Sequence, residues 1–215
     1  MKAKSLSIII GASLFAIAGL AQANTTYSSF VDVANSVSFD GWNQLNRNRV
    51  DANGAASPLT SEQLAAGTLS NVAGSGDATL KLLAGSYYPA GSGLYGDGNL
   101  SFTDTTVAAN IGSIVFQALV NNFAADPIAV SLNYNGGTQQ IAASLNQVDN
   151  YFTYTWNLTG ITTPITSYSI SLGAGFSQSL AFQVDQVSAV PEADSYAMML
   201  LGLGVMGAVV RRRSK

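Results

Sequence analysis

The chain has no cysteine and no histidine, and only 10% of its 215 residues are charged. Without cysteine it can form no disulfide and offers no thiol nucleophile. Without histidine it cannot build a Ser-His-Asp triad, and zinc loses both of its commonest protein ligands. The composition therefore argues against the commonest classes of hydrolase and zinc protein.

Positive charge is also scarce in the body of the chain, because six of the nine basic residues lie at its two ends. Between residues 24 and 194, twelve acidic and three basic residues leave a net charge of −9. Nucleic acids and anionic lipids present phosphates, which require lysine and arginine. The charge distribution therefore predicts a partner that is neither nucleic acid nor an anionic membrane surface.

The first 23 residues contain the three parts of a cleaved secretory signal. A positively charged start precedes an apolar stretch, Leu6–Leu20, and small residues, Ala21 and Ala23, follow at the positions that signal peptidase accepts. The sequence predicts cleavage after Ala23, so that the mature chain begins at Asn24. The alternative is an uncleaved signal anchor, which fits this short apolar run less well.

The C-terminal end combines a short motif, an apolar run and a basic tail. Val190-Pro191-Glu192 lies before an uncharged run of sixteen residues, Ser195–Val210, and Arg211-Arg212-Arg213 follows it. As a helix this run rises about 24 Å, and snorkelling arginines can extend it towards the roughly 30 Å of a bilayer core. The arginines stop transfer and stay in the cytoplasm, so the preceding chain is expected outside. The alternative, a buried core helix, leaves the basic tail unexplained.

Val190, Pro191 and Glu192, the Gly- and Leu-rich run and the terminal arginines together resemble the PEP-CTERM sorting domain. The resemblance implies recognition by an exosortase-like membrane protease after transient anchoring in the inner membrane of a Gram-negative bacterium. It also implies delivery to the cell surface or to an extracellular matrix of exopolysaccharide or biofilm. Ala193 stands where the family's motif has its second proline, which is a departure from the pattern.

Residues 24–189 predict one mainly β domain, a jelly-roll-like β-sandwich, with a short helix near its start. Short runs rich in β-branched and aromatic residues alternate between apolar and polar, and Gly, Asn, Asp and Pro separate them. The predicted strands are Ala78–Leu83, Asn99–Thr106, Ser113–Val120, Ile128–Asn133, Gln139–Leu145, Tyr151–Leu158, Ser167–Leu172 and Leu180–Val187. Tyr134–Thr138 is typical of a hairpin turn. The helix is expected over Pro58–Gly67, with Ser57 as its N-cap.

No catalytic residue is predicted, and we expect a protein without enzymatic activity. Lys81 is the single lysine available for a Ser-Lys dyad, and its strand pattern favours a solvent-facing position. A hydrolase built on two carboxylates remains an alternative, although Glu62 is the only glutamate well inside the domain. The expected class is a cell-surface or extracellular-matrix protein, and the alternative is a secreted carbohydrate-binding module.

A calcium site is compatible with the residue types present, because calcium needs only oxygen ligands. Asp97, Asn99 and Asp104 supply such oxygens along a Gly-rich segment that is expected to be a loop. In the alternative, Asp and Asn in a turn cap their own backbone and hold no metal. No other cofactor is predicted.

Aromatic residues outside the regular strand pattern are the candidates for contact with polysaccharide. Trp42, Tyr87, Tyr88 and Tyr95 are such residues, and exposed aromatic rings can stack on sugar rings. In the alternative they belong to the core, as is expected of Trp156, which alternates with other aromatics in its strand.

Overall fold

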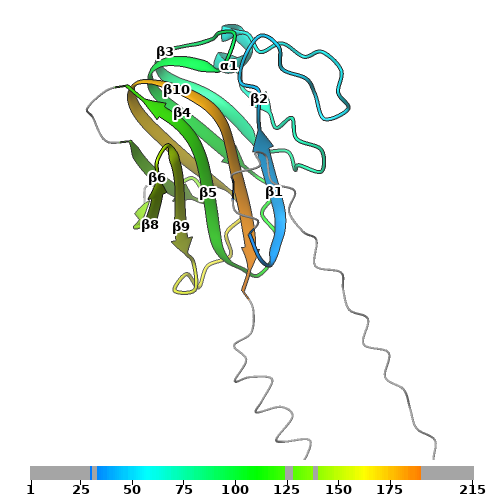
Figure 1. Cartoon of the computed structure of the whole chain (residues 1–215). Coiled ribbons are helices and arrows are strands. Elements are labelled where there is room, and N and C mark those ends of the chain that lie inside the picture. Colours follow the sequence, from blue (N-terminus) through cyan, green and yellow to red (C-terminus); the bar gives the residue numbers. More distant parts are fainter. Residues whose placement is uncertain (1–29, 31–32, 124–127, 138–139, 190–215) are drawn as a thin grey trace, which may run out of the picture.

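The computed structural model describes residues 30, 33–123, 128–137 and 140–189. These residues form one antiparallel sheet of ten strands and one short helix (Figure 1). The predicted signal peptide (1–23) and the predicted membrane helix (195–210) lie outside the described residues. Within the described part, no helix has both the length and the apolar character needed to cross a membrane.

The sheet has the order β2-β3-β4-β10-β5-β9-β8, with β1 and β6 also paired to β10 and β7 paired to β6. The elements are β1 (Ser36–Trp42), α1 (Ser61–Ala66), β2 (Thr68–Leu69), β3 (Thr79–Pro89), β4 (Leu94–Asp104), β5 (Ile111–Asn122), β6 (Ala129–Tyr134), β7 (Gln140–Ile141), β8 (Ser144–Val148), β9 (Tyr151–Asn157) and β10 (Tyr168–Ser188). The mainly β prediction is confirmed. No strand was predicted at β1 or β2, and the predicted strand Gln139–Leu145 is divided between β7 and β8.

The long strand β10 organises the sheet. Its first part, Tyr168–Gly173, lies between β4 and β6, whereas its last part pairs with β5 and β1. The pairing with β4 is irregular between Ala174 and Ser177, and a second irregularity against β5 follows after Ser179. The predicted break between two strands is therefore a bulged region within one strand, because glycine tolerates the bend of a bulge.

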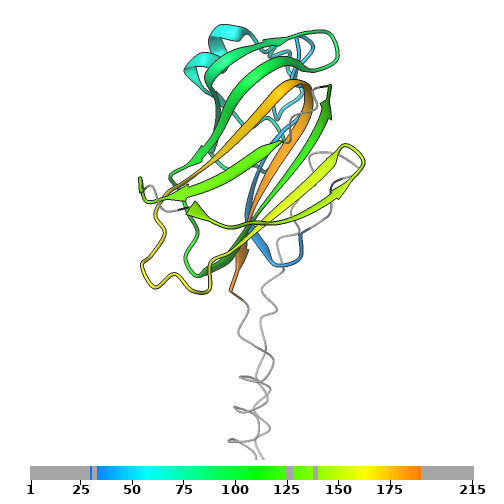
Figure 2. The ribbon, with the colours of Figure 1, turned by 90° about the vertical axis from the view of Figure 1, so that its left-hand side faces the viewer.

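The sheet folds over on itself and encloses an aromatic core (Figure 2). Phe102 of β4 contacts both Phe116 of β5 and Phe182 of β10, with ring centroids 4.8 Å apart in each pair. The partner of Phe102 in β10 is Ile170, far along the strand from Phe182, so these contacts join two layers of the same sheet. Where a sandwich of two sheets was expected, the chain has one continuous folded sheet.

The Gly-rich segment that was expected to be a loop is part of β4. Gly96 and Gly98 have φ values of +147° and +127°, which glycine adopts without strain. A Cβ atom on Gly98 would lie 2.1 Å from the carbonyl oxygen of Ala84 in β3. Here the glycines permit close approach of two strands, so they support pairing where the sequence suggested a turn.

The short helix is confirmed at Ser61–Ala66, although its N-cap is Thr60 and not Ser57. The Thr60 hydroxyl accepts a hydrogen bond from the Gln63 amide, and the Gln63 side chain accepts one from the Thr60 amide. This reciprocal pair is a capping box. Gly67 follows the last helical residue, as predicted.

The start of β1 and the end of β10 lie at one pole, at the bottom of Figure 1. Ser36 at the start of β1 pairs with Val187, and Ile111 at the start of β5 pairs with Ser188 at the end of β10. Gln178 precedes Val187 by nine residues in β10, which corresponds to about 30 Å of extended strand. The bulged region of β10 is therefore remote from the pole where the chain enters and leaves the sheet.

Candidate functional site

Four neighbouring strands place aromatic and amide side chains in one line across the sheet. Tyr88 of β3 pairs with Tyr95 of β4, Tyr95 pairs with Gln178 of β10, and Gln178 pairs with Asn121 of β5. Direct cross-strand partners share one face of a sheet. We call these four residues the aromatic–amide row, and at usual strand spacing it spans about 14 Å.

A chain of hydrogen bonds fixes the polar part of the aromatic–amide row. The hydroxyls of Ser92 and Tyr95 lie 3.0 Å apart, and the Gln178 side-chain amide donates to the Ser92 hydroxyl at 3.2 Å. The Asn121 amide donates to the Gln178 side-chain oxygen at 2.8 Å, and Asn150 donates to the Asn121 side-chain oxygen at 2.8 Å. The row is thus ordered by its own contacts before any ligand arrives.

The aromatic members of the row are accessible. Tyr88 is 49% exposed, and its ring stacks on that of Tyr95 with centroids 6.1 Å apart. Phe123 and Phe176, which we call the phenylalanine pair, are 58% and 52% exposed, with centroids 5.9 Å apart. Phe123 follows Asn121 by two residues and Phe176 precedes Gln178 by two, so the pair adjoins the row on the same face.

The other two predicted aromatic candidates are not at this surface. Trp42 is completely buried, its indole N–H donates to the carbonyl of Thr68 at 3.3 Å, and its ring packs against Phe102. Tyr87 is also buried, and its hydroxyl lies 3.0 Å from that of Ser177. Alternation along β3 explains the difference, because Tyr87 faces the core and Tyr88 faces solvent.

The structure does not bring the predicted calcium ligands together. Asp97 and Asn99 are exposed on one face of β4, whereas Asp104 is buried on the other, as an odd separation in a strand requires. The Asp104 carboxylate accepts hydrogen bonds from the Thr106 amide, the Gln186 side chain and the Tyr168 hydroxyl. Among the described residues, no group of three or more acidic side chains is placed to bind a metal.

Buried acidic and polar side chains instead form a cluster inside the fold, namely Asp40, Asp104, Tyr168 and Gln186. Burial raises the pKa of Asp40 to about 7, and repulsion from Asp104 acts in the same direction. Hydrogen bonds from the Ala78 amide and the Ser70 hydroxyl to Asp40 act in the opposite direction. Burial and the two carboxylates also raise the pKa of Tyr168. Because both acids are buried, a polymer substrate cannot reach them.

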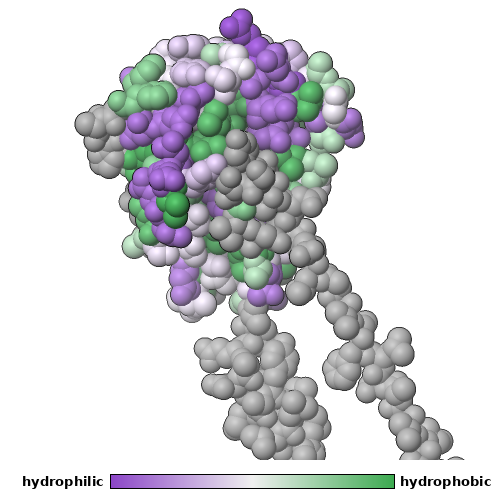
Figure 3. Space-filling model, viewed as in Figure 1, coloured by the Kyte–Doolittle hydropathy of each residue, from purple (hydrophilic) through white to green (hydrophobic). Residues whose placement is uncertain are grey.

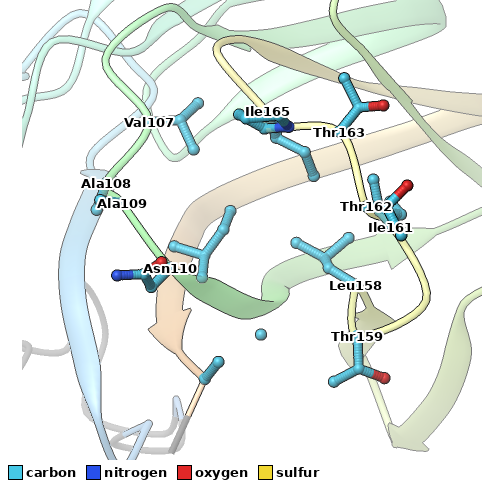
Figure 4. A pocket seen from close by; sticks show the side chains of 14 residues that line it. Val107, Ala108, Ala109, Asn110, Leu158, Thr159, Ile161, Thr162, Thr163 and Ile165 are labelled. Atoms are coloured by element: carbon cyan, nitrogen blue, oxygen red, sulfur yellow. The ribbon is translucent and has the colours of Figure 1, made fainter.

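A cavity with a volume of about 750 Å³ lies at the pole where β10 ends. It is lined by the segment before β5, by the segment between β9 and β10, and by Ala189. Figure 4 shows Val107, Leu158 and Ile165 around this space, with threonines at its rim. No titratable side chain lines the cavity, so it offers no acid–base chemistry.

The family model of the PEP-CTERM protein-sorting motif matches residues 189–213. The chain carries a PEP-CTERM sorting motif. This match confirms the resemblance based on Val190, Pro191, Glu192 and the basic tail. The PEP-CTERM motif indicates an exported protein that is anchored transiently in the membrane and processed by an exosortase, a membrane protease. No curated protein and no solved structure matches the chain.

The PEP-CTERM motif begins where the folded domain ends. The amide of Ala189, the first matched residue, donates to the carbonyl of Asn110 at 2.8 Å, and the Ser188 amide donates to the Asn35 carbonyl at 3.1 Å. Ala189 also packs closely against Gly112, where a Cβ atom would lie 2.9 Å from the Ala189 Cα. The sheet therefore fixes the chain up to the residue that precedes Val190.

Sequence reasoning identified Tyr88 and Tyr95 but missed Gln178, Asn121 and the phenylalanine pair. Gln178 and Phe176 fall between two predicted strands, in a segment that was assigned to a connection. Their alternation with Ser177 was a usable signal, but only if one strand was expected to continue through the glycines. Cross-strand pairing determines which of these residues are neighbours, and the pairing of distant strands cannot be read from a single sequence.

Proposed function

We propose that this chain is a non-enzymatic protein of the cell surface or extracellular matrix of a Gram-negative bacterium. An exosortase-like protease sorts it from the inner membrane. The PEP-CTERM motif at residues 189–213 is the observation that carries the proposal. A folded domain that joins the motif without an intervening segment is a suitable exported body for this route.

The finer parts of the route follow from the predicted ends of the chain. Signal peptidase cleaves after Ala23, and the run Ser195–Val210 holds the precursor in the membrane. The stop-transfer residues Arg211, Arg212 and Arg213 remain in the cytoplasm, so the sheet folds on the outer side. Matrix or surface attachment is then the task of the folded domain.

Two features favour a binding role over catalysis. The chain contains no histidine or cysteine to serve as base or nucleophile. The acidic pair Asp40 and Asp104, whose charges interact, is buried and already engaged in hydrogen bonds. The purified protein is expected to release no reducing ends from polysaccharides, and sustained hydrolysis would contradict the proposal.

The sorting part is tested with changes in the motif. In the native host, Pro191→Ala combined with Glu192→Ala is expected to leave the chain in the membrane fraction with its C-terminal tail attached. The unchanged protein is expected in the medium or on the cell surface without that tail. Glu62→Ala is the matched control, because Glu62 is an exposed acid remote in sequence from the motif. Equal release of all three forms would contradict sorting by an exosortase.

A further inference from the structure

The surface formed by the aromatic–amide row and the phenylalanine pair has the composition of a ligand-binding site. Accessible aromatic rings stand beside amide groups, each of which both donates and accepts hydrogen bonds. Large exposed apolar side chains that gather on one face are uncommon on isolated domains and mark sites of interaction. Figure 3 shows one face of the molecule, where smaller hydrophobic areas lie within a mainly hydrophilic surface.

The chemistry of this surface matches sugars. A sugar ring has an apolar face of C–H groups and a rim of hydroxyls, so it needs a flat aromatic partner and polar groups beside it. The stacked rings of Tyr88 and Tyr95 supply the first. The amides of Asn121 and Asn150 supply the second, and Gln178, which is buried, holds Asn121 in place by accepting its hydrogen bond.

The shape of the site favours a chain of sugars over a single unit. The aromatic–amide row crosses four strands, and adjacent strands are about 4.8 Å apart. Tyr88, Tyr95 and Asn121 thus lie one and two strand spacings apart, with the buried Gln178 between the last two, and these intervals are comparable to the lengths of one and two sugar units.

The charge of the protein favours neutral polysaccharides over anionic ones. No lysine or arginine belongs to the row or to the phenylalanine pair, and the exposed charges near the row are Asp97 in β4 and Arg47, whose amide donates to the Ala90 carbonyl. The body of the chain carries a net charge of −9. Polyanions such as uronate polymers are repelled by such a surface, so a neutral chain is favoured.

The position of the surface also fits a precursor held by its C-terminal end. Gln178 lies about 30 Å along β10 from Val187, and β10 ends beside the first residue of the sorting motif. The row therefore remains accessible while the chain is still anchored.

We propose that the aromatic–amide row, together with the phenylalanine pair, binds an extended neutral polysaccharide. Tyr88 and Tyr95 stack on sugar units, Asn121 and Asn150 bond their hydroxyls, and the buried Gln178 holds Asn121 and Ser92 in position. This inference deepens the proposed function, on which its biological setting rests, but the binding itself does not depend on sorting.

Affinity electrophoresis of the full chain in a detergent without a sugar headgroup tests the proposal. The gels contain hydroxyethylcellulose, laminarin, pullulan or alginate. We expect at least one of the three neutral glucans to retard the protein and alginate to have no effect. Tyr88→Ala and Tyr95→Ala should each weaken the retarding interaction about tenfold or more, as loss of a main anchor does.

Leu69→Ala is the matched control, because Leu69 is equally exposed but pairs with Thr79 at the other end of β3. It should bind like the unchanged protein.

Tyr95→Phe keeps the ring and removes only the hydroxyl, so it should bind better than Tyr95→Ala. The proposal is overturned if no neutral glucan retards the protein, if alginate does so more strongly, or if both tyrosine-to-alanine variants bind normally. Correct sorting without glucan binding would refute this site and leave the exosortase route intact.

Discussion

At the scale of single residues, burial decides what each polar side chain can do. Tyr87 and Tyr88 are adjacent in sequence, yet one is buried against Ser177 and the other is half exposed. Trp42 is likewise buried, and its indole N–H, its only side-chain hydrogen-bond donor, is bonded to the Thr68 carbonyl inside the fold. The sequence identified aromatics as a class, but it could not assign each to core or surface without the register of β1 and β3.

Asp40 should make the stability of the domain depend on pH. Its pKa is about 3.8 in an unfolded chain and about 7 in the fold, so the folded state holds a proton that the unfolded state releases between these values. Protonated Asp40 therefore contributes its full stabilisation of the fold below about pH 4, and this contribution is lost as the pH rises through 7. Stability of the unchanged protein should therefore fall between about pH 4 and pH 7 and level off above that range.

Asp40→Asn removes the ionisable group but keeps an oxygen that can accept from the Ala78 amide. At pH 8 we expect the variant to be more stable by about 1–2 kcal/mol, less than the full pKa shift implies, because a neutral amide oxygen accepts weaker hydrogen bonds than a carboxylate. Thermal unfolding at several pH values measures this. Asp97→Asn, at an exposed position, should follow the unchanged protein. An identical pH dependence in Asp40→Asn and the unchanged protein would contradict the burial argument.

At the scale of elements, strands with alternating patterns were predicted well, and glycine caused the errors. The bounds of β5, β6 and β9 were predicted to within a few residues, because β9 alternates with a period of two and β5 is a run rich in β-branched and apolar residues. In β4 and β10, glycines suggested turns, whereas the folded chain uses them for close strand contact and for a bulge. Pairing partners far away in sequence decide between these outcomes.

Gly98→Ala should be strongly destabilising. The new Cβ atom would lie 2.1 Å from the Ala84 carbonyl oxygen, and φ of +127° is unfavourable for alanine. A loss of about 2–4 kcal/mol is expected, as for other strained or overpacked sites. Denaturant unfolding measures it. Gly91→Ala is the control, because open space surrounds that position. Equal stability of the two variants would show that β3 and β4 do not approach as described.

At the scale of the whole molecule, the sequence predicted the mainly β class and the sorting motif, while the architecture and the binding surface emerged from the fold. Charge placement and the local pattern at residues 190–213 require no three-dimensional information, which is why that motif was accessible. The aromatic–amide row joins four strands that are separated in sequence, from Tyr88 to Gln178. Only the pairing of β10 with both β4 and β5 places them side by side.

The central claim is that the acidic body of the chain crosses the membrane and is then released by cleavage at its C-terminal motif. Intact-mass measurement of the extracellular form from the native host tests it most directly. We predict a chain that begins at Asn24 and lacks Arg211–Lys215. A folded chain found only in the cytosol, still beginning at Met1 and ending at Lys215, would contradict the account.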